Sequence, residues 1–280
     1  MNIASAINLG PTHLGQPRAI GAVHIGCVNG PRGTTLKDLS QQGSLRVLFP
    51  RVPENSDLLG VTINTAGGIT GGDRFTITAH AGMNSRLTLT TQAAGGIYRA
   101  TGMEVGRRST DLTVPKGARL DWLPQETILF NRAALQRDLH IKMARDSVFL
   151  AVEPLVFGRI TMGESLRQIS FTDNIRLYRD DELIFADATH LIGDAGAQLA
   201  SPFMANAAGA SAAVLYAAQD ADVFLPRIRE LLPVIAGASL IRPGVLFARL
   251  LAPDSYILRQ SLIPVIECLR GTTLPKTWTL

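Results

Sequence analysis

Asn64-Thr65-Ala66-Gly67-Gly68-Ile69-Thr70-Gly71-Gly72-Asp73 is the stretch around which the rest of the chain is organised. Glycine tolerates positive φ angles and allows other backbone segments to approach closely. The pairs Gly67-Gly68 and Gly71-Gly72 therefore predict a tightly folded connection that larger side chains would obstruct. An apolar segment, 58–63, precedes the run and the alternating segment 75–79 follows it. We therefore expect a turn between two strands, with Asp73 at the start of the second.

The run does not have the pattern of a nucleotide-binding loop. A Walker A loop requires Gly-Lys-Ser/Thr, and a dinucleotide-binding loop requires glycines at its first, third and sixth positions before a helix. Neither pattern occurs here. A structural turn is therefore the simplest interpretation of the run, and the carboxylate at its end leaves a chemical role open.

The composition excludes several classes of protein. The chain has 280 residues, of which 46% are hydrophobic and 18% charged, enough to bury a substantial core. The net charge is +4, but the basic residues are scattered, so we expect no nucleic acid partner. Cys27 and Cys268 form no Cys-x-x-Cys pair, which argues against a disulfide framework or a cysteine zinc site. No segment resembles a secretion signal or a membrane span, so we expect a cytoplasmic protein without a membrane partner.

An internal repeat predicts stacked strand pairs. Segments 111–130 and 138–157 align without a gap, and each begins Asp-Leu-x-Val/Ile, turns near its middle and ends in Phe. Segment 75–91 is a looser third copy. Repeats of this length are typical of stacked supersecondary units, although chance similarity between two strand-turn-strand units is an equal alternative. If the copies stack, Glu126 and Glu153 occupy equivalent places on adjacent layers, with Thr91 or Gln92 near the same line.

The remaining elements complete a mainly β fold. We expect stacked, helix-like layers of β-sheet with two α-helices near the C-terminus. Asp220 or Asp222 would cap the first helix, and the second would begin at Asp254 and stop at Gly271, with a kink at Pro264. Further strands are expected over these segments: 44–49, 168–172, 175–179, 183–186, 211–217 and 245–251. Residues 1–33 read as a variable, loosely ordered leader, and residues 34–280 as a single β-rich domain.

No catalytic constellation is recognisable, and the five histidines are dispersed. A run of acids instead lies in or beside apolar, strand-like sequence, where a carboxylate must be paired, hydrated or near a cation. Hard divalent ions accept such oxygens without a His/Cys cage, so a transient ion path is chemically allowed. The acids are Asp73, Glu126, Glu153, Glu164 and Asp187. Ordinary ion pairing with Arg99, Arg159 or Arg176 is at least as probable for any one of them.

Several motifs in fixed order resemble the urease accessory protein family UreD, also called UreH. They are Asn64–Asp73, Leu-Thr-Thr-Gln-Ala-Ala…Ile-Tyr-Arg (89–99), Leu-Pro-Gln-Glu-Thr-Ile-Leu-Phe (123–130), Glu-Pro-Leu-Val-Phe-Gly-Arg…Met-Gly-Glu (153–164) and Arg-Leu-Leu-Ala-Pro-Asp-Ser (249–255). The resemblance marks Gly67, Gly68, Gly71, Gly72, Tyr98 and Arg99 as motif residues. Each motif alone is weak, but the ordered set is specific from about Thr34 to the C-terminus.

The resemblance implies a non-enzymatic chaperone scaffold for nickel insertion. Members of the family bind UreF, which recruits the GTPase UreG, and the assembly docks on apo-urease. The family is thought to carry an internal tunnel, and its proposed tunnel acids match Asp73, Glu153 and Asp187. Nickel would bind there only transiently, so no tightly bound cofactor and no stable metal site are expected.

One departure and one alternative function are apparent. Where the family often has a small polar residue and a Lys, this chain has Gly95-Gly96, which puts any role of those side chains in doubt. Glu126 and Glu153 could alternatively serve as the acid and nucleophile of a carbohydrate-active β-enzyme. The low aromatic content, 6%, argues against that alternative because sugar sites usually use aromatic platforms.

Overall fold

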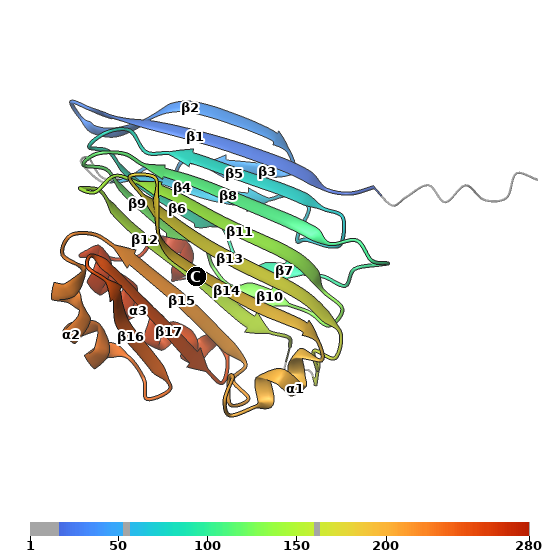
Figure 1. Ribbon diagram of the computed structural model, residues 1–280. Coiled ribbons are helices and arrows are strands. Elements are labelled where there is room, and N and C mark those ends of the chain that lie inside the picture. Colours follow the sequence, from blue (N-terminus) through green and yellow to red (C-terminus); the bar gives the residue numbers. More distant parts are fainter. Residues whose placement is uncertain (1–16, 53–56, 160–162, 280) are drawn as a thin grey trace, which may run out of the picture.

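The computed structural model describes residues 17–52, 57–159 and 163–279, and it consists of two stacked β-sheets covered on one side by helices (Figure 1). The first sheet has seven strands in the order β14-β13-β11-β8-β5-β1-β2. Its strands are β1 (Ile20–Gly30), β2 (Gly33–Gly43), β5 (Arg74–His80), β8 (Gly106–Val114), β11 (Ala134–Met143), β13 (Ile169–Arg179) and β14 (Glu182–Gly193).

The second sheet has ten strands, eight of them in the order β16-β17-β15-β12-β9-β6-β4-β3, with β10 paired to β12 and β7 paired to β10. Its strands are β3 (Leu45–Leu48), β4 (Leu58–Asn64), β6 (Arg86–Thr91), β7 (Gly95–Ile97), β9 (Arg119–Leu123), β10 (Thr127–Leu129), β12 (Val148–Phe157), β15 (Ala210–Ala217), β16 (Ala236–Arg242) and β17 (Val245–Ala252).

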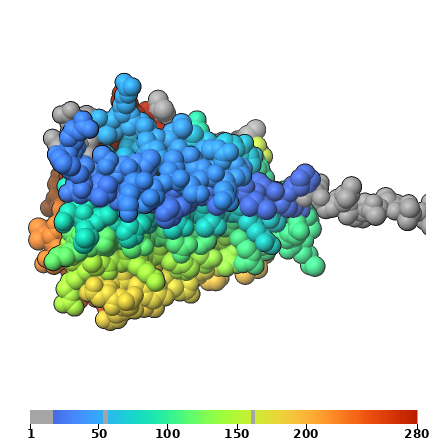
Figure 2. Space-filling view, turned by 90° about the horizontal axis from the view of Figure 1, so that it is seen from above, coloured from blue at the N-terminus to red at the C-terminus, as the bar shows by residue number. Residues whose placement is uncertain are grey.

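The chain alternates between the sheets, and each passage adds one layer. Strands β5, β8 and β11 lie side by side in parallel in the first sheet, while β6, β9 and β12 do so in the second. In Figure 2 the colours accordingly run in bands from blue to yellow across the molecule. The mainly β, stacked arrangement predicted from the repeat is therefore confirmed.

The register of the repeat differs from the gapless alignment. Asp138 pairs with Ser109, two residues before the expected Asp111. A slip of two residues leaves every side chain on the same face of the sheet, so the hydrophobic pattern cannot distinguish the two registers. Thr127 pairs with Leu155, so Glu126 and Glu153 are not equivalent positions on adjacent layers, and that expectation was wrong.

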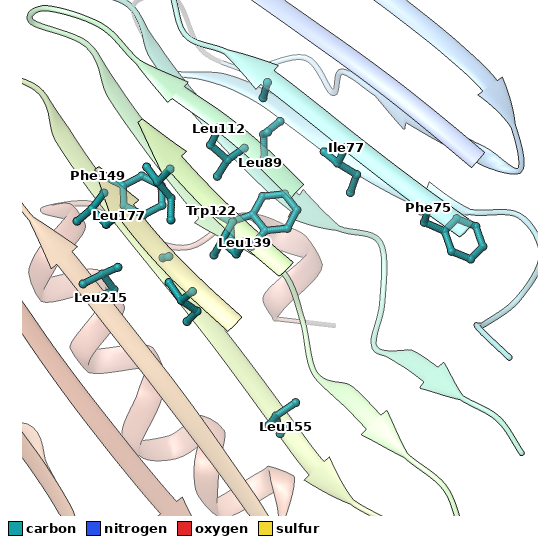
Figure 3. Close-up of a cluster of buried hydrophobic side chains, with 14 of the residues drawn as sticks. Phe75, Ile77, Leu89, Leu112, Trp122, Leu139, Phe149, Leu155, Leu177 and Leu215 are labelled. Atoms are coloured by element: carbon teal, nitrogen blue, oxygen red, sulfur yellow. The ribbon is translucent and has the colours of Figure 1, made fainter. Parts of the chain in front are cut away.

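The core has two parts. Between the sheets, alternate side chains of both form one apolar cluster that includes Phe75, Leu112, Trp122 and Phe149 (Figure 3). The outer face of the second sheet forms a second cluster with the C-terminal helices. The helices are α1 (Ala195–Ala200), α2 (Ala221–Leu231) and α3 (Ser255–Arg270).

The predicted start and end of the second C-terminal helix are confirmed. Asp254 caps α3 by accepting a 2.8 Å hydrogen bond from the Ile257 N–H, and Gly271 ends the helix at φ 68°. Asp220 precedes α2 but accepts from the Tyr216 hydroxyl instead of capping the helix. The short helix α1 was not predicted. No helix in the described ranges is long and apolar enough to cross a bilayer.

Three further corrections concern strands. The loosely ordered leader expected over residues 1–33 needs correction from residue 20 onward, because β1 pairs in parallel with β5; residues 1–16 lie outside the described part of the chain. The expected strands 168–172 and 175–179 form one strand, β13. Strand β2 was not predicted, because its polar residues carry no clear apolar alternation.

The glycine run carries the chain from β4 in the second sheet to β5 in the first. Gly67 and Gly72 have φ angles of 80° and 87°, which favour glycine. Gly68 is required for a different reason: a Cβ there would lie 2.2 Å from Cε2 of Tyr98. The run is thus built for close packing as well as for unusual backbone angles.

We expect Gly68→Ala to destabilise the protein by about 1–3 kcal/mol, because the new methyl group would have to displace the Tyr98 ring or the Gly96 carbonyl. Gly95→Ala is the matched control, since a Cβ there meets nothing within 4 Å, and it should change stability by less than about 0.5 kcal/mol. Urea unfolding measures both. Equal stability of the two variants would contradict the packing role of Gly68.

Candidate functional site

A row of polar side chains crosses the otherwise apolar space between the sheets. In the first sheet, the strand register places Arg108 of β8 beside Arg137 of β11, and Arg137 beside Asp173 of β13. Asp173 is in turn paired with Thr189 of β14. Because these positions are directly opposite one another on parallel or antiparallel neighbours, their side chains lie on the same face of the sheet.

Arg137 lies at the centre of this row and is 2% exposed. Its Nε and Nη2 donate to the two carboxylate oxygens of Asp173 at 2.8 and 2.6 Å. Its Nη1 donates to Thr127 Oγ1 at 3.0 Å and lies 2.6 Å from Glu153 Oε2, in the other sheet. Burial opposes the charge of Arg137, but Asp173 and Glu153 outweigh it and raise the arginine pKa.

Glu153 is held from two directions. Trp122 Nε1 donates to its Oε1 at 2.8 Å, and Arg137 pairs with its Oε2. The carboxylate is 4% exposed, so its negative charge is compensated inside the protein.

Asp187 and Arg249 continue the row to the far edge of the first sheet. Arg249 Nη2 donates to Asp187 Oδ2 at 2.6 Å, which joins β17 of the second sheet to β14 of the first. In the second sheet, Ala213 is the register partner of both Glu153 and Arg249, so the two ion pairs are separated by one strand. We call this row the polar seam. Its members are Arg108, Arg137, Glu153, Asp173, Asp187 and Arg249.

Glu126 is held by the C-terminal helix. Arg259 of α3 donates to both Glu126 oxygens, at 2.5 and 2.8 Å, and to Gln125 Oε1 at 2.9 Å. The hydrogen bond to Glu126 raises the pKa of Arg259. Glu126 also lines a cavity of about 270 Å³ between the sheets, next to the glycine run. Arg108, at one end of the seam, lines the same cavity.

Asp73 is placed apart from the other predicted acids. It is 4% exposed and accepts hydrogen bonds from the N–H groups of Thr70 and Ala19, both at 2.8 Å. The carboxylate therefore closes the glycine run on itself and ties it to the start of β1. The structure brings Glu153 and Asp187 into one seam, places Glu126 at the adjoining cavity, and gives Asp73 a role in the turn.

The other motif residues lie at the surface near the run. Tyr98 stacks on Phe130 with ring centroids 5.2 Å apart. Arg99 lines an open hollow at the same end of the molecule. Of the arginines expected to pair with acids, Arg159 pairs with Glu164 at 3.3 Å.

The seam is not a preassembled metal site. Among the described residues, no group of three or more His, Cys, Asp or Glu side chains is placed to hold a metal ion. Each seam acid is already neutralised by an arginine, so a divalent ion could bind only by displacing a guanidinium. The same pairing argues against glycosidase chemistry, because Glu126 and Glu153 are each engaged by an arginine instead of facing a sugar across a cleft.

Sequence reasoning missed the arginines that compensate the acids. Arg137 had a detectable signal, because it alternates with Leu135 and Leu139 and so points into the core with them. Arg249 and Arg259 had no comparable signal, since their partners Asp187 and Glu126 are far away in the sequence.

Comparison with known proteins identifies relatives along nearly the whole chain. The model of the family described as UreD urease accessory protein matches residues 19–279. The urease accessory protein UreD of Ruegeria pomeroyi is 47% identical over 247 residues, which make up 88% of this chain and 96% of the relative. The urease accessory protein UreD of Ruegeria sp. is 46% identical over a segment that covers 94% of this chain and 91% of the relative. UreD 3 of a Bradyrhizobium species is 41% identical over 93% and 94%, respectively.

We expect Arg137→Met to destabilise the fold by about 3–5 kcal/mol, because it leaves Glu153 and Asp173 buried without their shared cation. Arg249→Met is the control: its ion pair is partly exposed, so its removal should cost about 1 kcal/mol or less. Denaturant unfolding followed by circular dichroism measures the difference. Similar losses for the two variants would show that Arg137 does not hold the sheets together.

Proposed function

The chain belongs to the UreD family of urease accessory proteins, and we propose that it acts as a non-enzymatic scaffold in the maturation of urease. The observation that carries the proposal is the family match over residues 19–279, together with relatives that are 41–47% identical over most of their length. The interior supports it, because the buried acids are neutralised by arginines and are not arranged as a catalytic pair.

We further propose that the chain works in the cytoplasm in a complex with UreF, which recruits the GTPase UreG, and that this complex engages apo-urease. Several large apolar side chains are almost fully exposed, which is compatible with protein partners. The most exposed are Met103, Phe203 and Val234. No tightly bound cofactor is part of this proposal.

The polar seam is our candidate for a transient nickel route. Carboxylate oxygens suit a hard divalent ion, and Glu153 and Asp187 are the acids of the seam that the family resemblance singles out. In the empty state, Arg137 and Arg249 compensate these acids, so the route needs no resident metal. Asp73 was expected to contribute as well, but its two backbone hydrogen bonds favour a role in the turn.

Urease activation with purified UreF, UreG and apo-urease tests the route. We expect Glu153→Gln and Asp187→Asn to lower urease activity and nickel content severalfold, while the variants still co-purify with the partners. Glu164→Gln is the control, because Glu164 pairs with Arg159 outside the seam. Thermal unfolding checks that each variant is folded.

Two other outcomes would contradict parts of this proposal. Full activation by both seam variants would leave an interaction scaffold without a part in the nickel route. Failure of the unchanged chain to join the complex or to support activation would refute the proposed function itself.

A further inference from the structure

Arg108 is the only seam member without an ion-pair partner among the described residues. The register places it between Phe75 and Arg137, so two arginines lie side by side on the inner face of the first sheet. Both neighbouring acids, Glu153 and Asp173, bind Arg137. Arg108 lies with its Cζ 5.7 Å from the centroid of the Trp122 ring, and its Nε is buried without a hydrogen-bond partner.

This arrangement leaves the Nε donor of Arg108 unsatisfied and gives its positive charge no carboxylate in direct contact. Burial lowers the pKa of Arg108, and the charge of Arg137 lowers it further, while Glu153 and Asp173 oppose the shift from a distance. A buried guanidinium N–H that lacks an acceptor costs free energy, and an anion is the partner that would satisfy both the donor and the charge.

The cavity beside Arg108 has the size and the lining for a small ligand. Its volume of about 270 Å³ equals the space of several water molecules. Glu126 also lines it, but both carboxylate oxygens are bound to Arg259, so Arg108 supplies the unpaired charge. Much of the remaining wall is apolar, formed by Leu45, Ile63, Ile69, Phe75, Ile77 and Ile97.

We propose that this cavity binds a small monocarboxylate, with the carboxylate on Arg108 and a short aliphatic chain against the apolar wall. The planar guanidinium matches a carboxylate in shape and charge. Gln125 and Thr91 also line the cavity and provide polar surroundings for the head group. A free divalent cation is disfavoured at this point because it would meet the charge of Arg108. The site adjoins the proposed nickel route, because Arg108 is a member of the polar seam, but it is formed by this chain alone and is tested without the partners.

Isothermal titration calorimetry on the full-length chain tests the proposal. The probes are sodium formate, acetate, propionate and butyrate, titrated at constant pH and constant ionic strength with chloride as the replacement salt. We expect saturable binding with one site per chain that tightens from formate to propionate, because each added methylene is buried against the apolar wall. Absence of saturable binding by all four probes would overturn the proposal.

Variants of Arg108 locate the site. Arg108→Met should weaken binding about tenfold or more, because a charged hydrogen bond is lost. It should not lower the melting temperature, since Arg108 makes no ion pair and its removal takes away a buried N–H that has no acceptor. Arg107→Met is the matched control: Arg107 is exposed and donates to Gln136, so binding should be unchanged.

Two further results would refute the assignment. One is equal affinity of the Arg108→Met variant and the unchanged chain, and the other is an equal loss in Arg107→Met. If Arg108→Met fails to fold, Arg108→Lys decides instead. That variant keeps the charge but not the planar fork, so we expect weakened binding that retains its dependence on chain length.

Discussion

The pairing of one guanidinium with two carboxylates holds the two sheets of this protein in register. Arg137 projects from the first sheet and binds Asp173 beside it and Glu153 opposite it, in a space that is otherwise apolar. Buried ion pairs of this kind add little net stability compared with apolar packing, but they do not tolerate the loss of one partner. Their contribution is specificity: a slipped sheet would separate charges that must remain together.

The winding of the chain makes this pairing possible. Each layer contributes one strand to each of the two sheets. The inward-facing residues of successive layers therefore form continuous rows across the interior. An apolar row packs with the row opposite, whereas the polar row of Arg137 is paired with Asp173 in its own sheet and with Glu153 in the other. The glycine run carries the chain back from the second sheet to the first, between β4 and β5, and Asp73 fixes its geometry through backbone N–H groups. Asp73, the acid that ends the run, therefore stabilises the turn, and both of its carboxylate oxygens are used for this purpose.

Local signals explain what the sequence could predict. The strand alternation, the cap at Asp254 and the stop at Gly271 depend on neighbouring residues, and all three are present in the structure. The register of the repeat depends instead on packing between sheets, and a slip of two residues leaves the pattern unchanged. The acids of the seam were recognisable as acids in apolar sequence. Their arginine partners were not, because the pairing of Arg259 with Glu126 joins segments from opposite halves of the chain.

A buried polar cluster must balance its charges and must also satisfy its hydrogen-bond donors and acceptors. The seam meets the first requirement but not fully the second. Arg108 and Arg137 together match the charges of Glu153 and Asp173, so the cluster is neutral. The contacts, however, are concentrated on Arg137, and the Nε of Arg108 has no acceptor in the described structure. Because the cluster is neutral, it can be buried in an apolar interior. Because the Nε of Arg108 lacks an acceptor, the stability of the cluster at Arg108 depends on what occupies the neighbouring cavity. The seam is thus fully paired at Arg137, whereas at Arg108 it can still accept a hydrogen-bond partner.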